Sequence, residues 1–354
     1  MYQNSPFNHY NMKKIKWLLF VCLLLNNVFI HAQTASVDSI KFFTDEGIID
    51  MTLTTDIKKL QTEKKLNVYQ DASVVMRFPD STIISEGIRM YARGHFRREN
   101  CTIPPMMLNF HNPTSPKLNP LGKLKLVIGC GNSTDDEQLI LKEYLIYKIY
   151  NILEQKSFRV RLLKTNYQDS RNKMKPFSQY AFLIEDDNEM ADRNGCVKKD
   201  DQQWQTESTH RSTMTMVAVF EYMISNGDWS VPGNHNTKLI FAKGNNSTIP
   251  FVVPYDFDHS GFVNASYATP NELLGTESVT ERVYRGFPRT MEELQATFEV
   301  YKSKKDAITS LVMNFTLLKE KTRKEIVSYL NEFYKTINDK RQVQSIFIDN
   351  ARTK

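Results

Sequence analysis

The chain has 354 residues, of which 41% are hydrophobic and 24% are charged, and its formal net charge is +6. This is the composition of a globular protein that is long enough to bury a large core in one or two domains. Because the excess of positive charge is small and spread along the chain, it does not indicate a nucleic-acid-binding protein.

Residues 12–33 have the pattern of a secretory signal. A basic start (Lys13, Lys14, Lys16) precedes an apolar run from Trp17 to Leu25, and Ala32 supplies a small residue near a cleavage point. The run is too short for a convincing transmembrane span. We therefore predict a signal peptide over residues 1–33, starting at Met1 or Met12, and a secreted or periplasmic mature protein. An uncleaved N-terminal anchor is the alternative.

From Gly47 to Ile128, short β-rich runs alternate with turns rich in Pro, Asn and Gly. The runs are Ile48–Thr55, Ala72–Phe78, Ile83–Ala92, Met106–Phe110 and Lys123–Ile128. They predict an antiparallel sheet. In the last run Lys123 and Lys125 alternate with leucines, so both lysines are expected on one face of the sheet.

Three cysteines remain after the signal: Cys101, Cys130 and Cys196. If Met106–Phe110 and Lys123–Ile128 pair antiparallel with Phe110 opposite Lys123, Cys101 and Cys130 lie at the same end of the ladder. An oxidising compartment would let them form a disulfide. We therefore predict a Cys101–Cys130 bridge with Cys196 unpaired; three free thiols are the alternative.

Asp135–Glu154 has the apolar periodicity of an amphipathic helix, with Ser133 or Thr134 as its N-cap. Two further strands, Phe158–Leu163 and Gln179–Ile184, precede a helix-rich remainder that contains helices over Thr206–Ile224 and most of Met291–Ile348. This order predicts an α+β protein with a strand-rich N-terminal lobe (34–187), a mostly helical C-terminal lobe (188–354) and a cleft between them.

Two polar clusters follow predicted elements in the second half. Asn226-Gly-Asp228 begins a loop that ends at His235-Asn236, and Asp256-Phe-Asp258 follows a strand. A carboxylate in the first loop can accept the proton of an attacking hydroxyl, while an amide and a later carboxylate can hold Mg²⁺ or Mn²⁺ against nucleotide phosphates. Asp256 and Asp258 can share one ion only if a turn intervenes. The simpler alternative is that both clusters are ordinary turns.

The order of several motifs resembles the CotH family of spore-coat-protein-H-like kinases. The motifs are Tyr91-Ala-Arg-Gly94, Lys123-Leu-Lys-Leu126, Leu141-Lys-Glu-Tyr144, Tyr180–Glu185, Asn226-Gly-Asp228, His235-Asn236 and Asp256-Phe-Asp258. They cover most of residues 85–265. The resemblance implies a two-lobed, atypical protein-kinase fold with an antiparallel-sheet N-lobe that contains one helix.

The resemblance also implies roles for individual residues. Asp228 would be the catalytic base. The metal ligands would be Asp256 and Asn236, with Asp258 beside them and Asn234 as the substitute for Asn236. The nucleotide would be held by Lys125 or Lys123, by Glu143 as the partner of the lysine, by Arg93 in the Gly94 segment, and by Glu185 near the adenine.

Two departures from the family pattern bear on activity. Trp229 follows Asp228 where a basic residue is common, and the bulky His95-Phe96 follows Gly94. The resemblance, together with the predicted signal peptide, implies an exported kinase that transfers phosphate from ATP–Mg²⁺ to Ser or Thr hydroxyls of a protein. The two departures favour the alternatives. The alternatives are a catalytically weak envelope protein that binds nucleotide or a partner, and a metal-binding module or hydrolase that uses the same loops. The Gly-x-Ser-x-Gly elbow of a serine hydrolase is absent.

Overall fold

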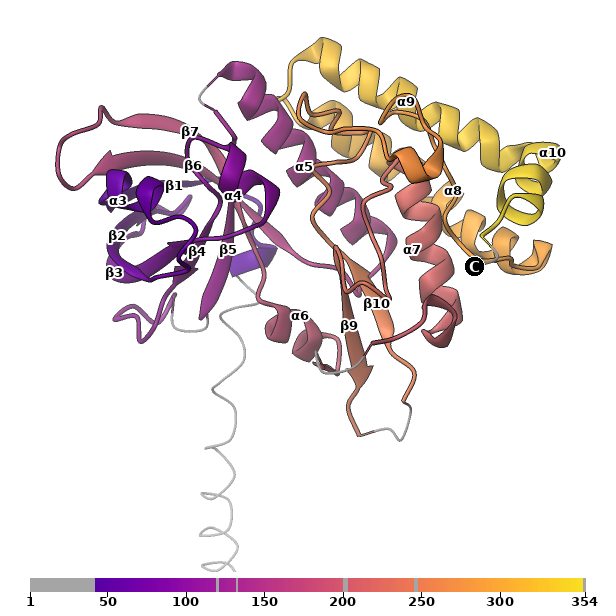
Figure 1. The fold of residues 1–354 in the computed structure, drawn as a ribbon, viewed down its shortest axis with the longest axis horizontal. Coiled ribbons are helices and arrows are strands. Elements are labelled where there is room, and N and C mark those ends of the chain that lie inside the picture. The colour runs from indigo at the N-terminus through magenta and orange to yellow at the C-terminus, as the bar shows by residue number, and fades with distance from the viewer. Residues whose placement is uncertain (1–41, 119–120, 132, 200–202, 245–247, 353–354) are drawn as a thin grey trace, which may run out of the picture.

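The computed structural model describes residues 42–118, 121–131, 133–199, 203–244 and 248–352 (Figure 1). The predicted signal peptide lies outside these residues. Figure 1 shows a β-barrel built from the first half of the described chain and a helix-rich region built from the second half, with the long helix α5 (Thr134–Leu153) between them.

The barrel has seven strands in the order β1-β2-β3-β4-β5-β7-β6. Their bounds are β1 Ile49–Thr55, β2 Gln70–Arg77, β3 Ile83–Ala92, β4 Met106–Asn109, β5 Lys123–Ile128, β6 Val160–Asp169 and β7 Phe177–Ile184. Side chains alternate along the strands between the barrel interior and the outside, as in β3, where every second residue is buried. Two short helices connect consecutive strands: α3 (Ile57–Thr62), whose Ile57 and Leu60 pack into the barrel core, and α4 (Phe96–Asn100).

The prediction of a two-lobed kinase fold with an antiparallel N-terminal sheet is wrong. β1 pairs in parallel with β6, from Ile49 opposite Leu163 to Thr55 opposite Asp169, and this pairing closes the sheet into a mixed barrel. Closure removes both sheet edges, whose unpaired N–H and C=O groups would otherwise be open to other chains. The two strands are more than a hundred residues apart, so their individual apolar patterns carried no sign of this contact.

The predicted disulfide is confirmed, and its register is corrected. Cys101 and Cys130 are bonded with their Cα atoms 4.6 Å apart, and Cys196 is free and buried. The neighbouring strands pair with Asn109 opposite Lys123, one residue from the predicted partner Phe110. The bridge joins the end of α4 to the residues after β5, so it fixes a short helix that reaches the candidate site.

The second half of the chain forms a three-stranded sheet and a set of helices. The sheet order is β10-β9-β8, with β8 Cys196–Lys198, β9 Thr237–Ala242 and β10 Phe251–Pro254. The helices are α6 Asp187–Arg193, α7 Arg211–Met223, α8 Met291–Asn314, α9 Glu320–Asn338 and α10 Lys340–Val343, with short turns η1 Thr206–Ser208, η2 Glu272–Leu274 and η3 Gln344–Asp349. The helix predicted over Thr206–Ile224 is thus split into η1 and α7. Within the described ranges, no helix combines the length and apolarity needed to cross a membrane.

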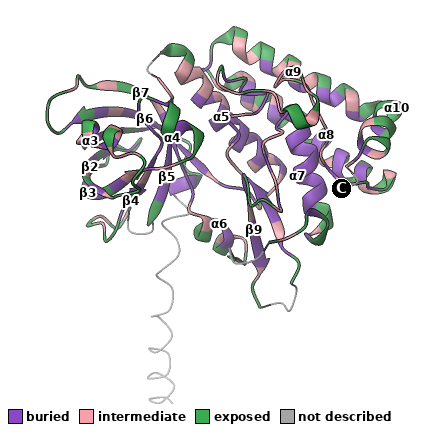
Figure 2. Ribbon diagram, in the orientation of Figure 1, coloured by how far each residue is buried: buried purple, intermediate pink, exposed green. Residues whose placement is uncertain are grey.

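Two hydrophobic cores lie on either side of the barrel wall (Figure 2). Leu124, Leu126 and Ile128 of β5 enter the barrel core, whereas Val127 on the opposite face joins the larger core around α5 and α7. As predicted, Ser133 caps α5. The alternation in β5 therefore directs Lys125 and Val127 toward the helical region, where the candidate site lies.

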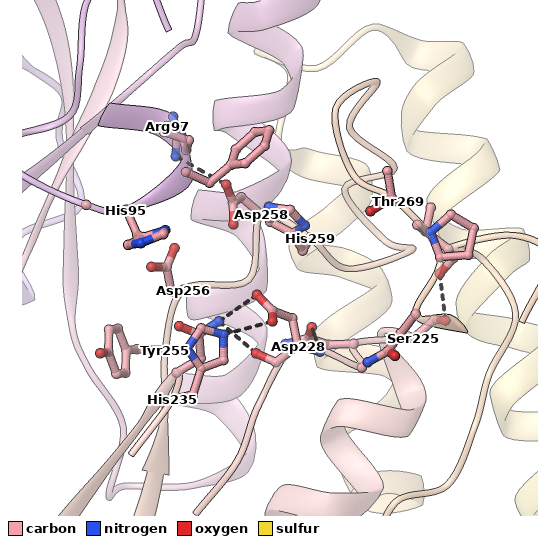
Figure 3. A pocket seen from close by; sticks show the side chains of 18 of the residues that line it. His95, Arg97, Ser225, Asp228, His235, Tyr255, Asp256, Asp258, His259 and Thr269 are labelled. Carbon is pink, nitrogen blue, oxygen red and sulfur yellow. Dashed lines mark hydrogen bonds and ion pairs between the residues drawn. The ribbon is translucent and has the colours of Figure 1, made fainter. Parts of the chain in front are cut away.

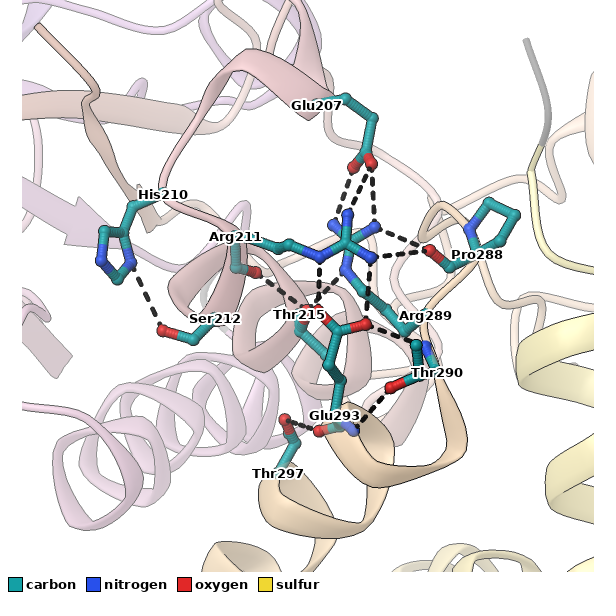
Figure 4. A network of polar contacts seen from close by, with 10 residues as sticks. All are labelled: Glu207, His210, Arg211, Ser212, Thr215, Pro288, Arg289, Thr290, Glu293 and Thr297. Atoms are coloured by element: carbon teal, nitrogen blue, oxygen red, sulfur yellow. Dashed lines mark hydrogen bonds and ion pairs between the residues drawn. The ribbon is translucent and has the colours of Figure 1, made fainter.

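A buried arginine fixes the segment that leads into α8 (Figure 4). Arg289 donates to both carboxylate oxygens of Glu207, at 2.9 and 2.7 Å, and to Oγ1 of Thr215 at 2.8 Å. Beside it, Arg211 forms an ion pair with Glu293 in the first turn of α8. These contacts join η1, α7 and α8, and they anchor one end of the 269–289 segment, part of which lines the cavity described next.

Candidate active site

A cavity of about 680 Å³ opens between the barrel and the helical region (Figure 3). Residues from three parts of the chain line it. They are Arg93–Arg97, Pro105, Val127 and Ile184 from the barrel side, Ser225–Asp228, His235, Asn236, Tyr255, Asp256, Asp258 and His259 from the loops of the C-terminal sheet, and Thr269–Asn271, Leu274, Thr276, Ser278, Val279, Glu281 and Val283 from an irregular wall. The two polar clusters predicted from sequence thus meet in one cavity.

Asp228 is held by three neighbours within its own loop. His235 Nε2 lies 2.8 Å from Asp228 Oδ1, and Asn236 Nδ2 donates to Asp228 Oδ2 at 3.0 Å and to the Asp228 carbonyl at 2.7 Å. The backbone N–H of Asp228 donates to Asn226 Oδ1 at 3.0 Å. With 42% of its side chain exposed, Asp228 is both oriented and accessible to a molecule in the cavity.

The charges around Asp228 keep it ionised. Burial alone would raise the pKa of Asp228, but the hydrogen bond and charge of His235 lower it below the usual value for an aspartate. The same hydrogen bond raises the pKa of His235. Asp228 is therefore an anion at neutral pH and can accept a proton.

Asp256 supplies the turn that the sequence required of the Asp256/Asp258 pair. Its backbone has φ +65, and its N–H donates to the hydroxyl of Tyr147 at 2.9 Å. No described residue donates a hydrogen bond to its carboxylate, which faces the cavity in Figure 3. Burial and the neighbouring charge of Asp258 raise the pKa of Asp256. The positive charges of Arg93 and Arg97 oppose this increase. A carboxylate that accepts no hydrogen bond from the described residues fits a hard divalent cation.

Asp258 lies in a buried network with Arg97 of α4. The guanidinium of Arg97 is 3.7 Å from Asp258 and 3.5 Å from Glu143 of α5, and it also donates to the carbonyl of Ile128. Tyr267 donates to Asp258 Oδ2 at 3.1 Å. Burial raises the pKa of Glu143 well above its usual range, with a further increase from Asp258. Arg97 thus lies within ion-pair distance of two carboxylates at the base of the cavity, and the charge of Arg93 also acts on Glu143.

The remaining predicted residues are placed differently from expectation. Lys125 forms an ion pair with Asp187, and not with Glu143, which takes Arg97 as its partner. Four predicted residues do not line the cavity: Lys123, Lys125, Glu185 and Asn234. Lys123 is exposed, and Glu185 forms an ion pair with Arg193 at 2.9 Å. Arg93 does line the cavity, and no described residue forms an ion pair or a hydrogen bond with its side chain.

Asp256 and Asn236 are the residues that best fit a metal ligand set. The Nδ2 of Asn236 is used on Asp228, which leaves its amide oxygen for an ion beside Asp256. Within the described residues, no group of three or more His, Cys, Asp or Glu could form a metal site unaided. A Mg²⁺ ion held by Asp256 and Asn236 would take its remaining ligands from water or from a second molecule, such as nucleotide phosphates.

Sequence reasoning missed three features of the site. Arg97 lies in a five-residue helix that is too short for a periodic signal, and the wall from Thr269 to Val283 has little regular structure. Glu221 is buried within α7, one turn before the loop of Asp228, and the backbone N–H of Asn226 donates to its carbonyl at 2.8 Å. An ionisable residue in an otherwise apolar helical run was the available signal for Glu221.

The amino-acid sequence was compared with known proteins. No protein-family model and no curated protein matches the chain. The CotH resemblance therefore remains a prediction from motif order.

Glu221 should make stability depend on pH. Burial raises its pKa to about 8, against 4.5 when exposed, so the folded protein retains a proton that the unfolded chain releases. The stabilisation is complete below pH 4.5 and is lost as pH rises to about 8, at about 1.4 kcal/mol per pH unit. The free energy of unfolding in urea is measured from pH 5 to 8 and plotted against pH. In Glu221→Gln the slope of this plot should lack the contribution of Glu221. Equal slopes in the two proteins would contradict a buried, protonated Glu221.

Proposed function

We propose that the cavity binds ATP–Mg²⁺ and that the protein transfers the terminal phosphoryl group to a hydroxyl of a protein substrate. The observation that carries the proposal is the placement of Asp228. It is ionised, oriented by His235 and Asn236, and open to a cavity that also contains the carboxylate of Asp256 and the guanidinium of Arg93, whose charges act on each other. The motif order that resembles the CotH family favours a nucleotide as the phosphate donor.

Each part of the cavity has a role in such a transfer. Arg93 would bind phosphate oxygens, and Asp256 and Asn236 would hold Mg²⁺, which supplies neutralisation of the phosphate charge when bound. The substrate hydroxyl oxygen forms a bond to the γ-phosphorus while the bond to the bridging oxygen breaks. Asp228 takes the hydroxyl proton, and the nucleoside diphosphate leaves with the electron pair of the broken bond.

Export of the protein is part of the proposal. The Cys101–Cys130 bridge suits an oxidising compartment, as the predicted signal peptide does. The substrate would then be a protein with accessible Ser or Thr hydroxyls outside the cytoplasm.

A second candidate is a hydrolase, and the bond between His235 and Asp228 favours it. An imidazole bonded to a carboxylate can activate water, so His235 would be the base and Asp228 the residue that orients it. The two candidates differ in the effect of His235→Gln. The variant should lose hydrolysis, whereas phosphoryl transfer by Asp228 should persist at a reduced rate.

Calorimetric titration of the mature protein with ATP, with and without Mg²⁺, tests the nucleotide proposal. We expect binding that requires Mg²⁺. We also expect loss of this binding in Asp256→Asn, because Asn keeps the left-handed backbone at φ +65 but lacks the charge. The apoprotein should melt at nearly the same temperature, since Asn keeps the backbone turn and the lost carboxylate accepts no hydrogen bond from the described residues.

Asn234→Gly is the matched control, because Asn234 also has a positive φ (+48) but does not line the cavity. It should bind ATP–Mg²⁺ as the natural protein does. A collapse of apoprotein stability in Asp256→Asn would instead show that the Asp256 carboxylate stabilises the fold and is not kept for a metal ion. Binding of ATP without subsequent transfer would identify a nucleotide-binding protein that has lost catalysis.

A further inference from the structure

Arg285 reaches the loop of Asp228 from an irregular segment far along the chain. Its Nη1 donates to the carbonyl of Gly227 at 2.5 Å and to the carbonyl of Trp229 at 2.7 Å. These two carbonyls belong to the residues on either side of Asp228. The guanidinium also lies 5.0 Å from the centre of the Trp229 ring, so the side chain is fixed by three contacts.

Arg285 holds the backbone before and after Asp228 through these bonds, whereas His235 holds its side chain and Asn236 holds both its side chain and its carbonyl. The carbonyl of Gly227 belongs to the peptide unit before Asp228, and the carbonyl of Trp229 belongs to the peptide unit after Trp229. One guanidinium nitrogen therefore restrains the backbone on both sides of the Asp228–Trp229 pair, and hence the direction of the Asp228 Cβ. The loop is closely packed on another side as well, because a Cβ on Gly227 would lie 2.7 Å from Leu274 Cδ1. Arg285 therefore completes the restraint on a loop with little room to shift.

We propose that Arg285 is a positioning residue that holds Asp228 in its catalytic orientation through the carbonyls of Gly227 and Trp229. The effect of Arg285 on catalysis rests on the proposed phosphoryl transfer, but the effect of Arg285 on the conformation of the Asp228 loop does not. Arg285 touches neither Asp228 Oδ atoms nor any other reacting group in the proposed transfer.

Arg282 provides a matched control in the same segment. It donates to the carbonyls of Met223 and Tyr329, at 3.1 and 2.7 Å, and stacks on the Tyr329 ring. These contacts join α7 to α9 without reaching the carbonyls beside Asp228. Both Arg285→Lys and Arg282→Lys keep a positive charge and lose the planar fork of donors.

Amide hydrogen exchange measures the loop without any assumption about function. In Arg285→Lys we expect the Asp228 amide to exchange at least about tenfold faster, because its bond to Asn226 Oδ1 depends on the loop geometry, while amides in the middle of α7 keep their protection. In Arg282→Lys the Asp228 amide should exchange at the natural rate. Equal Asp228 exchange in natural protein and Arg285→Lys would overturn the proposal.

Kinetics separate positioning from a general structural role. Arg285→Lys should lower kcat roughly 10²-fold and leave the KM for ATP nearly unchanged, since a small displacement of the base affects the chemical step and not nucleotide binding. An unchanged kcat in Arg285→Lys, or a change in KM alone, would overturn the proposal that Arg285 positions Asp228. If the natural protein transfers no phosphate, the proposed function fails, and amide exchange alone decides the role of Arg285.

Should Arg285→Lys fail to fold, the natural protein supplies the test. The guanidinium protons of Arg285 should exchange slowly with solvent, because two carbonyls accept from Nη1. Fast exchange of these protons in the folded protein would overturn the proposal.

Discussion

Asp228→Asn should reduce phosphoryl transfer by ~10²–10⁴-fold while leaving the binding of ATP–Mg²⁺ intact. The substitution keeps the shape of the side chain, and the amide oxygen can still accept from His235 or Asn236. What is lost is the ability to take a proton, since the lowered pKa of Asp228 makes it an anion at neutral pH. Transfer is measured with labelled ATP and an acceptor protein or by autophosphorylation, and binding by calorimetric titration.

Asp192→Asn is the control for this experiment. Asp192 is an exposed carboxylate in α6 that pairs with Lys243 and does not line the cavity, so its loss should leave transfer unchanged. Full transfer by Asp228→Asn would remove Asp228 from the chemical step. Loss of nucleotide binding together with transfer would show that the loop, and not the proton, had been disturbed.

Local sequence patterns predicted most individual elements of the fold. β3 and β5 have the predicted bounds, and α5 begins one residue before its prediction, with Ser133 as the cap. These elements are specified by alternation, apolar periodicity and capping residues, all of which are local. The closure of the barrel by β1 and β6 depends on a contact between distant strands, which no local pattern encodes.

The residues of the candidate site can likewise be separated into those that local sequence predicted and those that it did not. Asp228, Asn236 and Asp256 were predicted because loops at the ends of strands bring polar side chains together in a recognisable order. The ion-pair partners of Lys125 and Glu143 were not predicted. Lys125 pairs with Asp187 of α6 and Glu143 pairs with Arg97 of α4, and both of these short helices lack a periodic signal in the sequence. Arg285 was missed for the related reason that its segment is irregular.

Arg97→Met should be the most destabilising single change near the site. Arg97 is buried among Glu143 and Asp258, whose side chains are 1% and 7% exposed, so its removal leaves carboxylates in a low-dielectric environment without their cation. The loss of one partner from such a network costs roughly 3–5 kcal/mol. Denaturant unfolding of the natural protein and of Arg97→Met at neutral pH measures this difference in the free energy of unfolding.

The pH dependence of the Arg97→Met defect identifies its cause. Without the guanidinium, the pKa of Glu143, which burial already raises, should rise further, so the folded variant binds a proton more tightly than the unfolded chain. The stabilisation from that proton is present at low pH and is lost as pH rises, so the variant should be less impaired at pH 5 than at pH 8. Adding Glu143→Leu should recover part of the stability at pH 8, because it removes one of the unbalanced carboxylates. A defect of equal size at both pH values, without recovery in the double variant, would show that Arg97 acts through packing and its bond to the Ile128 carbonyl and not through charge.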